Sequence, residues 1–171
     1  MQTLYLLCGM PFSGKSTLGK AVAQYLNSPY ISLDEINEAR NLFGGEGIPI
    51  EEWEKTHSLA RDELQILMQS RQDIVVDDTS CFRWLRDRFR NFAAQYSYHT
   101  KIIFLDVPFA EIERRIKDNQ KTKARHQVKS DIVREMSETF EFPEEDEDVM
   151  TYNADRSVNE WINQNFKQIA N

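Results

Sequence analysis

The chain has few of the residues and patterns that mark whole classes of proteins. It contains two cysteines in 171 residues, Cys8 and Cys81, and they have neither metal-ligand spacing nor the pattern of a disulfide framework. No apolar run approaches the roughly 20 residues of a membrane span, and sequence typical of a strand starts at residue 3. We therefore expect one domain covering residues 1–171, without a signal peptide, in the cytoplasm and away from membranes.

The chain also lacks net positive charge. Its formal net charge is −7 at pH 7, so no global basic field attracts nucleic acid or anionic lipid. Nucleic acid is therefore a disfavoured partner, which would need a local basic track. We expect a monomer or a weak dimer.

The most informative stretch is residues 8–17, which read C-G-M-P-F-S-G-K-S-T. The pattern G-x-x-x-x-G-K-S lies between the apolar run Leu4–Leu7, typical of a strand buried on both faces, and a helical pattern over Leu18–Leu26. Strand, glycine loop and helix are the context of a phosphate-binding loop, in which backbone N–H groups and the helix N-terminus attract phosphates. The loop predicts binding of a nucleoside triphosphate through Gly9, Pro11, Ser13, Gly14, Lys15, Ser16 and Thr17.

Two side chains of this loop have specific expected roles. Lys15 can bridge β- and γ-phosphate oxygens, and the Ser16 hydroxyl can ligate Mg²⁺. We therefore predict ATP and Mg²⁺ as cofactors, with Lys15 as a catalytic residue. The sequence leaves the choice between ATP and GTP open.

Short apolar runs alternate with longer helical patterns as far as the C-terminus. Further strands are predicted at Tyr30–Leu33, Ile74–Val76, Lys101–Asp106 and Val149–Tyr152. Helices are predicted over residues 34–40, Glu51–Ser70 and Phe82–Tyr96, from Pro108 onward, and over Val158–Ile169. Five strands alternating with helices predict an α/β fold with a parallel sheet and right-handed crossovers.

Carboxylates follow three of the predicted strands, at the edge where ligands bind in open parallel sheets. Asp34 is the predicted general base, because the helix that it opens faces the crevice; its alternative role is a helix N-cap. Asp77 and Asp78 are predicted to hold Mg²⁺ through water, the alternative being a strand-exit turn. Asp106 is predicted to cap the next helix.

Two charged segments interrupt the alternation. Residues 114–129 are densely basic and are predicted to form a lid that brings cations to the triphosphate; the alternative is a solvated helix end. Phe140–Asp148 is acidic and is predicted to be a solvated connection to the fifth strand. On the helix from Glu51, Trp53 and His57 are predicted to lie at the edge of the core, the alternative being the wall of an acceptor pocket.

Together these motifs resemble the P-loop kinases of the nucleoside and polynucleotide kinase group. The resemblance rests on G-x-P-x-S-G-K-S-T, Asp34, I-V-V-D-D-T at residues 74–79 and F-L-D-V-P from Phe104, and it covers most of residues 1–140. Within the group, the sequence is similar to the kinase domain of phage polynucleotide 5′-hydroxyl kinase and to small bacterial ATP-binding kinases. The resemblance implies a three-layer sandwich with sheet order 2-3-1-4-5.

The resemblance also implies roles for single residues. It matches Asp34 to the general base and Asp78 to the aspartate before threonine, and it requires a lid arginine, for which Arg125 and Arg115 are the candidates. It also brings adenine against the backbone at residues 152–154, although an ordinary strand-exit loop fits those residues as well.

One departure affects the substrate. The phage enzyme has an arginine three residues after its base, where this chain has Asn37, and the nearest arginine, Arg40, falls on a different helix face. We predict an ATP-dependent kinase that phosphorylates a hydroxyl of a small-molecule or nucleoside-like acceptor. The alternatives are a polynucleotide 5′-hydroxyl kinase and, from another class, a nucleotide-dependent switch.

Overall fold

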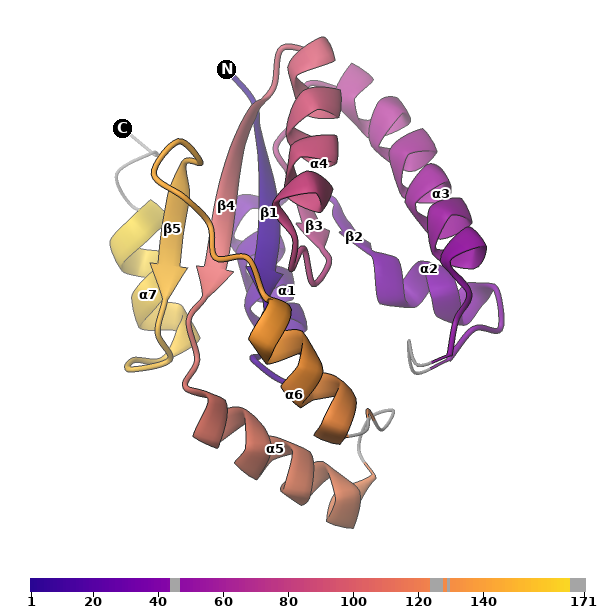
Figure 1. Ribbon diagram of the computed structural model, residues 1–171. Helices are drawn as coiled ribbons and strands as arrows, with labels where there is room; N and C mark the ends of the chain where they lie inside the picture. The colour runs from indigo at the N-terminus through magenta and orange to yellow at the C-terminus, as the bar shows by residue number, and fades with distance from the viewer. Residues whose placement is uncertain (44–46, 124–127, 129, 167–171) are drawn as a thin grey trace.

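The computed structural model describes residues 1–43, 47–123, 128 and 130–166. The middle layer is a five-stranded sheet in the order β2-β3-β1-β4-β5, with every neighbouring pair parallel (Figure 1). The strands are β1 (Thr3–Gly9), β2 (Tyr30–Ser32), β3 (Ile74–Asp77), β4 (His99–Leu105) and β5 (Val149–Tyr152). The predicted fold class and strand order are confirmed.

Helices cover both faces of the sheet. They are α1 (Lys15–Leu26), α2 (Leu33–Ala39), α3 (Ile50–Gln69), α4 (Arg83–Gln95), α5 (Phe109–Thr122), α6 (Ser130–Thr139) and α7 (Val158–Phe166). Helix α6 lies between the basic and acidic segments and was not predicted; the expected end of the last helix, Ile169, lies outside the described residues. No helix in the described part of the chain has both the length and the apolar character to cross a bilayer.

The alternation of side chains along β1 divides the core into two layers. Tyr5 and Leu7 pack with α1 and α7 on one face, whereas Leu4 and Leu6 pack with α3 and α4 on the other. These four side chains are 0–2 % exposed. Because both faces are buried, the strand reads as a continuous apolar run.

The register brings the carboxyl ends of the strands to one edge. Gly9 pairs with Leu105, Leu105 with Tyr152, and Ser32 with Asp77. Helices α5 and α6 lie beyond this edge, past the arrowheads of the strands (Figure 1). The edge therefore collects the loops that carry the predicted site.

The helix cap predicted at Asp106 is wrong, and so is the cap considered as the alternative role of Asp34. Helix α2 begins at Leu33, and its N-cap is Ser32, whose hydroxyl accepts a hydrogen bond from the Glu35 N–H at 3.3 Å. Asp34 therefore lies inside the first turn instead of capping the helix. Helix α5 has Pro108 at its N-cap position, so Asp106 does not cap it.

The acidic segment is not simply a solvated connection, as predicted. Glu147 is 2 % exposed and forms two hydrogen bonds with the buried Arg86 guanidinium, Nε–Oε1 at 2.8 Å and Nη2–Oε2 at 3.0 Å. Arg86 also donates to the carbonyls of Ser80 (3.0 Å) and Glu141 (2.8 Å). The ion pair fixes residues 141–147 against α4 and the loop that follows β3.

Loss of one partner of this pair is expected to destabilise the fold. Arg86→Met leaves a buried carboxylate without its counter-charge, which lowers the free energy of unfolding by about 3–5 kcal/mol. Arg86→Met combined with Glu147→Gln should cost clearly less than the sum of the single changes. Urea denaturation measures these values. The control is Arg83→Met on the same helix, whose partners Glu144 and Asp146 are exposed; an equal loss in that variant would contradict the assignment.

Candidate active site at the carboxyl edge of the sheet

The phosphate loop, residues 9–16, connects the centre of the sheet to α1. Gly14 is the N-cap of α1 and has φ 103°, a left-handed conformation that favours glycine. No side chain caps this end of α1 within the described residues, so the helix N-terminus keeps its capacity to attract an anion. At Gly9, a Cβ would lie 3.1 Å from both Ser13 Oγ and Leu105 Cβ, a tight fit that the missing side chain avoids.

Lys15 lies at the centre of the site. Its Nζ donates to the carbonyls of Gly9 (3.0 Å) and Met10 (2.9 Å). Burial lowers the pKa of Lys15, whereas the charges of Asp77, Asp34 and Asp78 raise it. Three of the four aspartates that were singled out in the sequence are therefore close enough for their charges to act on one ammonium group.

Asp77 is buried beside Tyr30, which the sequence analysis named only as the first residue of a predicted strand. The Tyr30 hydroxyl donates to Asp77 Oδ2 at 2.6 Å. Burial and the neighbouring Asp77 carboxylate raise the pKa of Tyr30, so its hydroxyl keeps its proton. The sequence offers one clue to this contact, because Tyr30 lies two residues before the end of β2, the strand that pairs with β3.

Asp78 forms the strand-exit turn that was considered for it, and its role toward Mg²⁺ stays a prediction. Its Oδ2 accepts from the Ser80 N–H (3.2 Å) and hydroxyl (3.0 Å), which is a strand-exit turn. Its charge also acts on His57 of α3: burial lowers the pKa of this imidazole, and Asp78 opposes that shift. The His57 ring lies 5.9 Å from the Phe89 ring, in the core edge that was predicted, yet close enough to the site to sense Asp78.

Helix α2 connects Asp34 to a polar network that the sequence analysis missed. One turn after the exposed Asp34, Asn37 is buried and its side-chain oxygen accepts from the Thr56 hydroxyl on α3. Thr56 in turn accepts from Arg40 Nη1 at 2.6 Å, and Arg40 forms an ion pair with Glu52. Asn37 and Arg40 thus reach the same residue of α3, so the expectation that they fall on different helix faces is wrong.

Of the two candidate lid arginines, Arg125 lies outside the described residues and Arg115 contacts the phosphate loop. Arg115 Nη1 donates to the carbonyls of Phe12 (3.0 Å) and Ser13 (2.8 Å), while Nε donates to Glu111 at 2.8 Å. A trans peptide directs its C=O and N–H in opposite directions. The guanidinium therefore holds two loop carbonyls on the α5 side and turns the following N–H groups away from α5.

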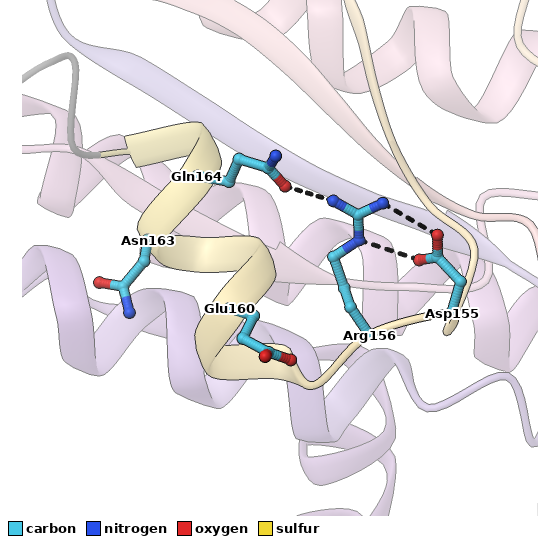
Figure 2. A pocket seen from close by; sticks show the side chains of 5 residues that line it. All are labelled: Asp155, Arg156, Glu160, Asn163 and Gln164. Atoms are coloured by element: carbon cyan, nitrogen blue, oxygen red, sulfur yellow. Dashed lines mark hydrogen bonds and ion pairs between the residues drawn. The ribbon is translucent and has the colours of Figure 1, made fainter.

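A surface pocket lies next to β5, which β4 separates from β1, the strand that leads into the phosphate loop. Its lining comes from the β5–α7 loop and from α7, and Figure 2 shows Arg156 between Asp155 and Gln164. The Tyr152 hydroxyl donates to the Arg156 carbonyl at 3.1 Å, which fixes the loop to β5. The pocket follows directly on residues 152–154, but none of the predicted phosphate-binding residues lines it.

The donor groups at the edge suit a hard cation better than a zinc-type site. Among the described residues, no group of three or more His, Cys, Asp or Glu side chains converges to hold a metal by itself. The Ser16 hydroxyl and the carboxylates of Asp77 and Asp78 are oxygen donors of the kind that Mg²⁺ prefers when phosphates and water complete its shell. The buried Ser13 hydroxyl has no partner in the described part of the chain.

Comparisons with known proteins agree with this architecture. A 31-residue stretch is 58% identical to shikimate kinase of Chlamydia pneumoniae, and the match spans 18% of either chain. The fold is similar to a gluconokinase from Sinorhizobium meliloti 1021, with TM-score 0.71, 21% identity, and coverage of 98% of this chain and 91% of that one. It is also similar to the APS kinase of Mycobacterium tuberculosis in complex with AMPPNP and APS, with TM-score 0.63, 18% identity, and 99% and 98% coverage.

These structural likenesses, at such low identity, concern the fold alone. The assignment to a family comes from the sequence. Residues 4–143 contain β1 from Leu4 onward, the phosphate loop, Asp34, Asp77, Asp78 and Arg115, and this segment matches the family described as AAA domain. The chain belongs to this AAA domain family of P-loop proteins.

Proposed function

We propose that the protein is an ATP- and Mg²⁺-dependent kinase that transfers the γ-phosphoryl group to a hydroxyl of a small-molecule or nucleoside-like acceptor. The observation that carries this proposal is the phosphate loop at the uncapped N-terminus of α1, which places Lys15 at the carboxyl edge of the sheet near Asp77 and Asp78 at the end of β3. A triphosphate held at the α1 N-terminus would bring its terminal phosphate to this ammonium group. The names of the similar proteins, which are kinases of small molecules, support the same reaction class.

Different residues of this chain would bind the phosphates and hold the cation during phosphoryl transfer. Lys15 would leave the carbonyls of Gly9 and Met10 for β- and γ-phosphate oxygens, and the uncapped α1 N-terminus together with the buried Ser13 hydroxyl would receive others. Ser16 would ligate Mg²⁺, with Asp77 and Asp78 acting through water. Bound Mg²⁺ neutralises charge on the transferred group.

Asp34 is the proposed general base. It is exposed on the first turn of α2 and close enough to Lys15 for its charge to act on the ammonium group. An acceptor hydroxyl beside Asp34 can pass its proton to the carboxylate as it attacks phosphorus. Water is not needed for this step, which suits transfer to an alcohol.

A small acceptor is favoured over a polynucleotide by the charges on α5. Arg114 is held between Glu111 and Asp118, and Arg115 is held by Glu111 and the phosphate loop. Two arginines of the basic segment are therefore already paired, which leaves less positive charge for a nucleic-acid backbone. ADP release in the presence of nucleosides, sugars, other polyols and oligonucleotides identifies the acceptor.

Replacement of the loop lysine should remove both nucleotide affinity and turnover. Lys15→Met deletes an ammonium group that would bond to charged phosphate oxygens, so ATP affinity should fall roughly 10- to 100-fold and acceptor phosphorylation should be lost. Calorimetry measures the affinity, and circular dichroism checks the fold. Lys101→Met, at a lysine paired with Asp148 at the start of β4, serves as the control. Unchanged nucleotide affinity in Lys15→Met would refute the proposed phosphate site.

Asp34→Asn should separate chemistry from binding. Because Ser32 caps α2, the change removes a charge without removing a cap. ATP should bind normally, while acceptor-stimulated ADP release falls by roughly 10²- to 10⁴-fold. The matched control is Glu35→Gln in the same helical turn, where the lost carboxylate pairs with Lys20 and activity should persist. Full acceptor phosphorylation by Asp34→Asn would move the base to Asp77 or Asp78. A switch protein would show no acceptor-stimulated ADP release even in the wild type.

Arg115→Ala tests whether the arginine at the phosphate loop acts on the reaction. If it also stabilises charge on the transferred phosphoryl group, kcat should fall by about 10³-fold with a smaller change in KM. If it serves only to orient the loop, nucleotide affinity should fall instead. Arg114→Ala is the control, because its partners Glu111 and Asp118 lie on α5 itself. An intact kcat in Arg115→Ala would leave Arg125 as the candidate.

A further inference from the structure

Tyr30 is fixed between α1 and the end of β3. A Cβ on Gly19 would lie 3.0 Å from Tyr30 Cε2, so the ring packs against the backbone of α1, and Lys20 Nζ lies 5.5 Å from the ring centroid. The hydroxyl donates to Asp77 Oδ2 at 2.6 Å. Tyr30 thus contacts one of the residues to which the cation was assigned.

The register of the sheet explains why a tyrosine is needed here. Ser32 pairs directly with Asp77, and Tyr30 lies two residues earlier on β2. Two residues of a strand span about 7 Å. A long side chain with a terminal oxygen crosses this gap, whereas a phenylalanine would fill the same space without a polar atom at its end.

The direction of the hydrogen bond between Tyr30 and Asp77 is set by chemistry. An ionised carboxylate can only accept, so the Tyr30 proton points to Asp77. This bond holds Asp77 Oδ2 and so fixes the orientation of the carboxylate.

We propose that Tyr30 is a positioning residue of the cation site, which orients the Asp77 carboxylate through the hydrogen bond from its hydroxyl. Tyr30 acts through this carboxylate and does not touch the transferred group. The inference rests on the proposed function in one respect, namely that a divalent cation enters the loop together with the nucleotide. It is independent of the acceptor and of Asp34.

The experiment compares ADP binding with and without Mg²⁺ in wild type and Tyr30→Phe. Calorimetry in Mg²⁺ and in excess EDTA gives the factor by which Mg²⁺ strengthens ADP binding. In Tyr30→Phe this factor should fall roughly 5- to 30-fold, as expected for one hydrogen bond to a charged group. ADP affinity in EDTA should change less than about twofold. Mn²⁺ electron paramagnetic resonance, which counts protein-bound cation in the presence of ADP, gives a second readout without turnover.

Tyr98→Phe is the matched control. Its hydroxyl is also mostly shielded and donates to the Gln72 carbonyl at 2.9 Å, but it lies just before β4, at the opposite edge of the sheet. A general loss of stability from a missing tyrosine hydroxyl would appear in both variants. Only Tyr30→Phe should change the effect of Mg²⁺.

A second change tests whether Tyr30 acts through Asp77. In an Asp77→Asn background the carboxylate to be oriented is absent, so Tyr30→Phe should add much less to the loss than it does alone. Equal Mg²⁺ effects in wild type and Tyr30→Phe would make Tyr30 a packing residue and overturn the proposal. If Mg²⁺ does not strengthen ADP binding to the wild type, the cation part of the proposed function fails with it. Failure to find an acceptor would leave the Tyr30 result standing.

Discussion

Burial of β1 on both faces is the constraint on which the site depends. Leu4 and Leu6 face one layer of helices, and Tyr5 and Leu7 face the other. A shift of one residue in register would exchange the two sets of side chains between differently shaped layers, so the register is strongly fixed. The pairing of Gly9 with Leu105 then sets the point at which the phosphate loop begins. A fixed starting point lets the short loop present its backbone the same way in every molecule.

The carboxyl edge of the sheet carries charges of both signs. The charges of three carboxylates act on the Lys15 ammonium group, and a triphosphate would add further negative charge. Cations must therefore accompany the ligand or come from nearby segments. Arg115 already contributes in an indirect way, because it neutralises the outer carbonyls of Phe12 and Ser13 and leaves the opposite side of those peptides electropositive. The site is prepared for an anion mainly by oriented backbone dipoles.

The sequence was a good guide where a signal is local. Apolar runs located all five strands, and G-x-x-x-x-G-K-S located the loop, because these patterns arise from burial and backbone geometry within a few residues. The strand order came from the resemblance and not from the residues. What could not be predicted depends on contacts between distant positions: Tyr30 reaches Asp77 only once β2 and β3 pair, and Glu147 meets Arg86 across 61 positions. Glu147 looked solvated because its neighbours are acidic, and nothing local distinguishes it from them.

Arg86 also determines how the edge of the sheet can move. One guanidinium is shared by the loop that carries Asp78, through the Ser80 carbonyl, and by the segment before β5, through Glu141 and Glu147. Neither segment can detach without leaving this buried charge incompletely solvated, so the two open together or remain closed together. Asp78 lies in a connecting loop, but the bonds to Arg86 tie this loop to the packed core. Opening of this edge of the sheet would therefore involve two parts of the chain, on either side of the central strand.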